Sequence, residues 1–181
     1  MSAYVNEQDD VRTTPLQDRG PVLPVRRSGQ AAASAPSQTA ERIVASPVGG
    51  KLEQAIGESP TTCAVREIFE ETGLVVQSSD LHLTGIVSES GFENRCHWLM
   101  FLYEVTRPVE VSCTTFDEGT LEWHDASEIP SLDLPETDRQ VIWPLFWRHR
   151  GGFFMAHIDC TGPSLAWRVE QSSPTFAGGL R

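Results

Sequence analysis

The pattern of apolar and polar residues separates a weakly patterned start from a strongly patterned remainder. Residues 1–40 show little aliphatic periodicity, and residues 28–38 are mostly small and polar, as in flexible segments. Residues 21–27 predict at most one short strand, because Pro24 disfavours a strand interior. We therefore expect a flexible or poorly ordered segment over residues 1–40, and a domain that begins with a short strand at 41–45.

The clearest predicted helix follows a turn at residues 46–50. Ser59 suits the N-cap, and Pro60 suits the first helical position, where its missing N–H costs nothing. The helical pattern continues to Thr72, and Gly73 supplies the C-terminal stop. These signals predict a helix from Pro60 to Thr72.

From residue 74 onward the pattern predicts mainly strands, because apolar and polar residues alternate between turn signals. Strands around two helices indicate an α+β or α/β sandwich of helices on a mixed sheet. We place this domain at residues 41–171 and a flexible tail at 172–181. The predicted elements are strands at 81–88, 97–105, 121–124, 153–159 and 165–169, a polar turn at 89–95, and a second helix from Arg139 to about Arg148.

Composition and charge limit the partners. The chain has 181 residues, 39% hydrophobic and 22% charged, as expected of one globular domain. A net charge of −11 argues against a nucleic-acid polymer or an anionic membrane, whereas a small phosphorylated substrate could bind through a metal bridge. The apolar stretches are too short to span a bilayer and the start lacks a signal-peptide pattern, so we expect a cytoplasmic protein.

The four cysteines are widely spaced and form no CxxC pair. In a cytoplasmic chain, reduced and mostly buried thiols are the simplest interpretation. A zinc site that includes Cys160 and His157 is the alternative, but the sequence offers no second ligand pair.

Three glutamates gather on the predicted helix. Residues three and four apart share a helix face, so Glu67, Glu70 and Glu71 lie within about one turn. Their mutual repulsion is costly unless a cation offsets it, and Mg²⁺ or Mn²⁺ prefers such oxygen ligands. A solvated helix face is the alternative, because several glutamates with one arginine usually form one.

The loop before this helix carries further candidate residues. The pair Gly49-Gly50 lets the backbone approach a ligand closely, and the Gly50 carbonyl could bind an ion. Lys51 could reach a phosphate, and Arg66 could hold a neighbouring carboxylate in place.

The ordered set of these residues resembles the Nudix box, G-x5-E-x7-R-E-U-x-E-E-x-G-U, in which U is aliphatic. The part from Glu58 through Arg66 to Leu74 matches at every position. In the first part, seven residues rather than five separate Gly50 from Glu58, and the extra residues fall in the loop at 54–57. On this motif the chain is identified as a member of the MutT-like Nudix hydrolase family.

Membership implies an α/β/α sandwich in which the box forms a loop–helix–loop, with Mg²⁺ or Mn²⁺ as the cofactor. The metal ions activate a water molecule, and a carboxylate takes its proton. The implied roles are metal contact for the Gly50 carbonyl, Glu67, Glu70 and Glu71; support of the box for Glu58, Arg66 and Gly73; and general base for Glu67 or for a glutamate outside the box.

The additional glutamate of the family usually follows the third long strand, where Glu118 is the candidate and Glu122 a weaker one. A solvated turn is the alternative for both. The tail also resembles oxidised-purine nucleoside triphosphatases, in which a Trp-Pro-Asp-Asp stretch holds the purine. Here Leu134 replaces the tryptophan, so its stacking is lost. Glu136 or Asp138 could contact a base, or could cap the second helix.

The expected function is cleavage of a diphosphate linkage in a nucleoside diphosphate derivative or a nucleoside triphosphate, oxidised or ordinary. ADP-ribose or a nucleotide sugar is the alternative substrate. A nucleotide-sensing module without turnover is the second class, but the retained glutamates argue against it, because a sensor needs no base. A Nudix-fold isomerase is the third. We expect a monomer or a homodimer.

Overall fold

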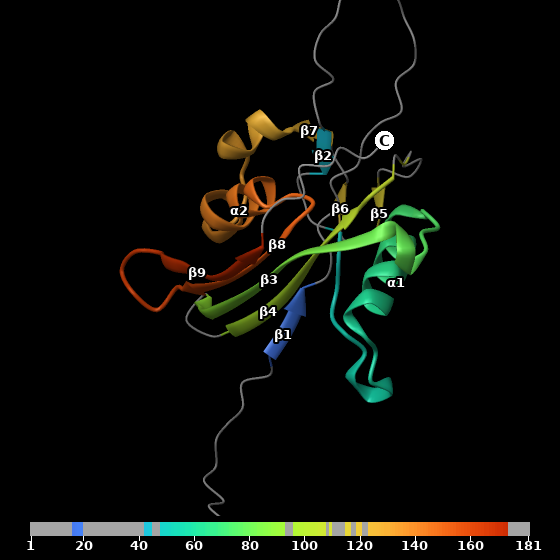
Figure 1. Ribbon diagram of the computed structural model, residues 1–181, viewed down its shortest axis with the longest axis horizontal. Helices are drawn as coiled ribbons and strands as arrows, with labels where there is room; N and C mark the ends of the chain where they lie inside the picture. Colours follow the sequence, from blue (N-terminus) through green and yellow to red (C-terminus); the bar gives the residue numbers. More distant parts are fainter. Residues whose placement is uncertain are drawn as a thin grey trace, which may run out of the picture.

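Five strands form one mixed sheet, which the computed structural model shows at the centre of the protein (Figure 1). The structure describes residues 16–19, 42–44, 48–92, 96–107, 109, 115–116, 119–120 and 123–173. The strands of the sheet are β1 (Leu16–Arg19), β3 (Leu81–Phe92), β4 (Cys96–Val105), β8 (Phe153–Asp159) and β9 (Ala166–Ser173). Their order is β1-β4-β3-β8-β9; β1 with β4 and β3 with β8 are parallel, and the other neighbours are antiparallel.

Two helices cover opposite faces of this sheet, α1 (Pro60–Thr72) and α2 (Trp143–Arg148). On β4, Val105 packs in the cluster that includes α1, whereas Met100 and Leu102 pack in the cluster that includes α2. Side chains alternate between the two faces of a strand, so odd and even positions of β4 face different helices. This arrangement confirms the predicted α/β/α sandwich. None of the helices within the described ranges is long and apolar enough to cross a membrane.

The second predicted helix contains a wider turn than an α-helix, directly after the α-helical residues 136–137. Residues Asp138–Ile142 form a π-helical turn that leads directly into α2. The N–H of Trp143 donates to the carbonyl of Asp138, five residues earlier, and Pro144 offers no N–H to continue the α-helical pattern behind it. The predicted helix is therefore confirmed, but it begins three residues before Arg139 and its early part is π-helical.

Strand β3 is longer than predicted, because the chain does not turn at Glu89. The polar turn predicted at 89–95 is wrong for its first half, where β3 continues to Phe92. Glu89 is only 4% exposed and pairs with Trp98 on β4. Gly91 has a φ of 71°, which lets the strand bend and shift register between Glu89 and Phe92.

Two short strand pairs lie outside the main sheet. The first, β2 (Arg42–Val44) with β7 (Trp123–Asp125), confirms the strand predicted at 41–45 and the described half of the strand predicted at 121–124. The second joins β5 (Thr115–Phe116) to β6 (Gly119–Thr120). The strands predicted at 153–159 and 165–169 are present as β8 and β9, which pair antiparallel as a hairpin.

The start of the chain contributes one strand that the sequence did not predict. β1 belongs to the main sheet and lies within residues 1–40, whereas the strand considered at 21–27 falls outside the described residues. β1 is short and polar apart from Leu16, so its apolar pattern is too brief to be recognised. The domain boundaries at residues 41 and 171 stay predictions.

Candidate functional site

Helix α1 begins and ends where its capping residues predict. The Ser59 side chain accepts the Thr62 N–H at 3.2 Å, and Pro60 is the first helical residue. At the other end Gly73 adopts a φ of 69°, and its N–H donates to the Phe69 carbonyl at 2.8 Å. Buried Ile68 anchors the helix against the sheet. The helix is therefore fixed at both ends, and its glutamates project from a defined scaffold.

Arg66 organises the carboxylates of this helix. Its Nε and Nη2 each donate to Glu58 at 2.9 Å in a bidentate pair. Its Nη1 donates to Glu67 Oε1 at 2.6 Å and to Glu70 Oε2 at 3.0 Å. The arginine hydrogen bonds lower the pKa of Glu58 to about 2, and Glu58 in turn raises the pKa of Arg66. Arg66 therefore offsets part of the repulsion among the clustered glutamates.

The glycine pair lies directly against two of these carboxylates. The Gly49 N–H donates to Glu71 Oε1 at 3.0 Å. A Cβ at Gly50 would lie 2.6 Å from Glu67 Oε2 and would overlap the rest of that carboxylate. Only glycine at position 50 thus allows Glu67 to approach the loop backbone. The structure therefore brings Gly49, Gly50, Glu67 and Glu71 together, whereas their roles as metal ligands stay a prediction.

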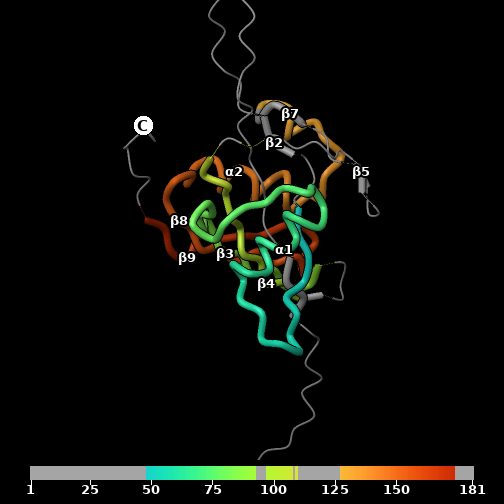
Figure 2. Tube along the Cα trace, turned by 90° about the vertical axis from the view of Figure 1, so that its right-hand side faces the viewer, coloured from blue at the N-terminus to red at the C-terminus, as the bar shows by residue number. Residues whose placement is uncertain are grey.

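The two extra residues of the loop are absorbed before the helix begins. Residues Gln54–Ile56 form a 3₁₀ turn that ends at Gly57, which has a φ of 66°. The Glu58 carboxylate accepts the Glu53 N–H at 2.9 Å and so closes this turn. The Lys51 carbonyl accepts from Arg66 Nη2 at 3.2 Å, which holds the loop alongside α1 (Figure 2). The insertion therefore leaves the glycine pair in place beside the carboxylates.

The residues around Gly50 fit a divalent cation by their chemistry. They supply carboxylate oxygens and a backbone carbonyl, which hard divalent ions prefer, and the missing Gly50 side chain leaves a close approach to Glu67. Within the part of the chain that the structure describes, no three acidic, histidine or cysteine side chains are arranged as a finished metal site. Arg66 contacts both Glu67 and Glu70, and Glu71 contacts Gly49, so the carboxylates are held by protein groups.

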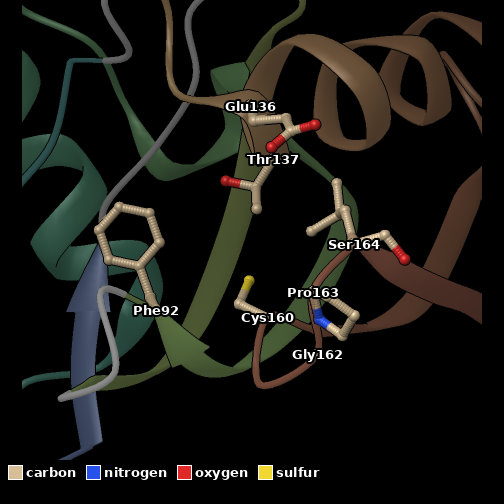
Figure 3. Close-up of a pocket in the computed structure, with 8 residues that line it drawn as sticks. Phe92, Glu136, Thr137, Cys160, Gly162, Pro163 and Ser164 are labelled. Atoms are coloured by element: carbon tan, nitrogen blue, oxygen red, sulfur yellow. The ribbon is translucent and has the colours of Figure 1, made fainter.

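A pocket of about 210 Å³ lies between the end of β3, the β8–β9 turn and the start of the second helix (Figure 3). Of the predicted substrate residues, Glu136 lines it and accepts from Gln140 Nε2 at 2.7 Å. Asp138 is 5% exposed and does not line it. Glu118 and Glu122 lie outside the described residues. The pocket is lined by Phe92, Glu136, Thr137, Cys160, Gly162, Pro163, Ser164 and Leu165.

The sequence offered Glu136 as a substrate residue and Phe92 as one of several aromatic residues that could stack on a base, and it missed the other lining residues of this pocket. Phe92 and Cys160 are far apart in the chain and meet only because β3 pairs with β8. A signal for part of the lining was the gap between the predicted strands at 153–159 and 165–169, because Gly162, Pro163 and Ser164 lie in this turn.

The cysteines with described side chains are unpaired thiols, Cys63 and Cys160. Burial, followed by the nearby Glu58, raises the pKa of Cys63 to about 12. Burial, followed by Glu89, raises the pKa of Cys160 to about 12. The zinc alternative gains no support, because Cys160 Sγ contacts Glu89 at 3.5 Å while His157 Nδ1 contacts Ser88 Oγ at 2.8 Å.

Comparison with known proteins agrees with the fold and the helix. The family model of the NUDIX domain matches residues 7–143. Because this match covers more than half of the chain, the protein belongs to the Nudix family. Nudix hydrolases generally use divalent metal ions.

Two relatives illustrate the likeness. The uncharacterized Nudix hydrolase YvcI of Bacillus subtilis (strain 168) is 28% identical over 95 residues, which are 52% of this chain and 59% of that protein. The chain therefore spans less than two thirds of this curated relative. The structure of the mutator MutT protein from Bacillus halodurans superposes with a TM-score of 0.59 at 22% identity, over 86% of this chain and 98% of that one. This second likeness supports the fold.

Proposed function

We propose that the protein is a metal-dependent hydrolase that cleaves a diphosphate linkage in a nucleotide-like substrate. The observation that carries this proposal is the contact of Gly49 and Gly50 with Glu71 and Glu67 on the capped helix of a Nudix domain. If the glutamates only formed a solvated helix face, position 50 would not need to be glycine to leave room for the Glu67 carboxylate. Glu67 is also only 9% exposed, which a surface glutamate rarely is.

The proposed ligands of the divalent ion, Mg²⁺ or Mn²⁺, are the Gly50 carbonyl and the carboxylates of Glu67, Glu70 and Glu71. When bound, the ion would neutralise the diphosphate oxygens and lower the pKa of a water molecule. Arg66 holds Glu67 through Oε1, so Oε2 is the oxygen that we propose as the proton acceptor. Glu118 is the alternative general base. Lys51 is proposed to bind a phosphate of the substrate.

The pocket beside Glu136 supports a nucleotide as the substrate. Phe92 offers an aromatic face, and the Glu136 carboxylate offers a hydrogen-bond acceptor for the N–H groups of a base. Asp138 is buried at the start of the π-helical turn, so we propose a supporting role for it rather than direct base contact. We propose nucleoside triphosphates, oxidised or ordinary, as the first substrates to test, and ADP-ribose or nucleotide sugars as the second.

The test is a panel of these substrates incubated with Mg²⁺ or Mn²⁺ and with the wild type, Glu67→Gln and Glu71→Gln. We expect turnover of at least one substrate that disappears with a chelator and falls by roughly 100-fold or more in both variants. Glu53→Gln is the matched control, because Glu53 takes part through its backbone N–H. Tight nucleotide binding without turnover by the wild type would favour the sensing module instead.

A further inference from the structure

Strand β9 presents a long exposed edge. It lies at one end of the sheet (Figure 1), and no described strand pairs with its outer side. Residues 166 to 172 are all exposed. The outer side of an edge strand carries backbone donors and acceptors that can accept another strand.

One side of this edge is apolar. Trp167 pairs with Ile158 on β8, and Val169 pairs with Ala156. Both β8 residues are fully buried on the α2 side of the sheet, and directly opposite residues share a face. Trp167 and Val169 therefore continue the α2-side face to the edge, where they are 46% and 37% exposed. Exposed tryptophan is typical of protein interfaces.

The charged residues of the edge stand in a self-complementary order. Arg168 and Glu170 flank Val169, and Arg168 Nη2 lies 2.7 Å from Glu170 Oε1. The register with β8 passes from Val169 to Gln171, so Glu170 forms a bulge that places its carboxylate beside Arg168. When two copies of β9 run antiparallel, Arg168 of each copy can therefore face Glu170 of the other, with Val169 between the two pairs.

We propose that β9 pairs antiparallel with β9 of a second copy of this chain, about a two-fold axis at Val169. In this register Arg168 faces the partner's Glu170, and the reverse pair forms by symmetry. Val169 meets its own copy, and each Trp167 lies diagonally across from the partner's Val169. Regular pairing spans Arg168 to Glu170, because the bulge moves Gln171 to the face opposite Trp167. This short seam has apolar side chains on one side and two ion pairs on the other.

The composition of β9 favours pairing over its avoidance. Edge strands that avoid partners carry proline, lysine or a bulge that twists the edge away. β9 has no proline, and its opposite charges attract a second copy in the register given above. The bulge at Glu170 adds local twist, and the short seam limits the affinity, so the dimer is expected to dissociate on dilution.

The experiment measures the mass of the full chain by size exclusion with light scattering over a dilution series. We expect the wild type to approach twice the 20.0 kDa chain mass at high concentration. In the Arg168→Glu dimer, a glutamate at position 168 would face a glutamate at position 170 in both symmetric pairs. In the Glu170→Arg dimer, an arginine would face an arginine in both pairs. Each variant alone should dimerise at least about tenfold more weakly. Mixed together, they should form a heterodimer, because every facing pair is again of opposite charge.

Arg148→Glu is the matched control, because it makes the same charge change on an exposed residue of α2 and should leave the dimer intact. Circular dichroism confirms that each variant is folded. A wild type that stays monomeric at every concentration overturns the proposal. So does a dimer that survives both single variants, or a mixture that remains monomeric.

Discussion

At the scale of single residues, the site depends on where side chains are missing as much as on where they are present. Gly50 has no room for a Cβ, because the Glu67 carboxylate occupies that space. Gly57, seven residues later, has nothing within 4 Å of its missing Cβ but adopts a φ of 66°. The two glycines are therefore required for different reasons, and substitution separates them.

Gly50→Ala should mainly lower activity, whereas Gly57→Ala should mainly lower stability. The added methyl at position 50 displaces Glu67, so we expect kcat/KM to fall by at least about tenfold. At position 57 the cost is backbone strain of about 1 kcal/mol in the free energy of unfolding, with activity retained. Steady-state kinetics and urea denaturation of both variants measure the two effects. Equal activity of the wild type and Gly50→Ala would contradict the contact.

The thiol of Cys160 should react slowly although it lines a pocket. Its pKa of about 12, against an ordinary value of 9.0, leaves little thiolate at pH 8. We expect alkylation of Cys160 by iodoacetamide to be roughly 100-fold slower or more in the folded protein than in urea, measured by mass spectrometry of the Cys160 peptide. Similar rates in both states would show that burial does not protect the thiol.

At the scale of elements, the loop and α1 act as one unit that the Glu58–Arg66 pair holds together. The helix was predictable because Ser59, Pro60 and Gly73 are local signals of its ends. The closing of the inserted turn by Glu58 was not predictable, because the same carboxylate serves Arg66 and the Glu53 N–H through space. The burial of Glu89 was missed for a similar reason: only pairing with β4 and β8 shows that the strand continues.

This unit should lose stability in acid. The pKa of Glu58 is about 2 in the folded protein and 4.5 ordinarily, so its stabilisation is present above pH 4.5 and is lost as the pH falls toward 2. Glu58→Gln should lower the free energy of unfolding by roughly 1–3 kcal/mol at pH 7 and much less at pH 2. Urea denaturation at several pH values measures both proteins. An equal deficit at every pH would contradict the ion pair.

At the scale of the whole molecule, the sequence predicted the sandwich, both helices and the C-terminal hairpin. Long periodic segments and capped helices are encoded locally, whereas the place of β1 beside β4 depends on contacts between distant residues. The pocket shows the same limit. Glu136 was a candidate from the resemblance of the tail to oxidised-purine nucleoside triphosphatases, but Phe92 and Cys160 join it only through the topology of the sheet.

The central claim is that the α1 carboxylates support attack of water on a diphosphate. The most direct measurement is turnover of a substrate from the panel, with Mg²⁺, in water that carries a heavy oxygen isotope, followed by mass spectrometry of the products. We predict that one phosphate-containing product gains a single labelled oxygen and that Glu67→Gln forms this product at least about 100-fold more slowly. No labelled phosphate product from any substrate, or an equal rate in Glu67→Gln, would contradict the claim.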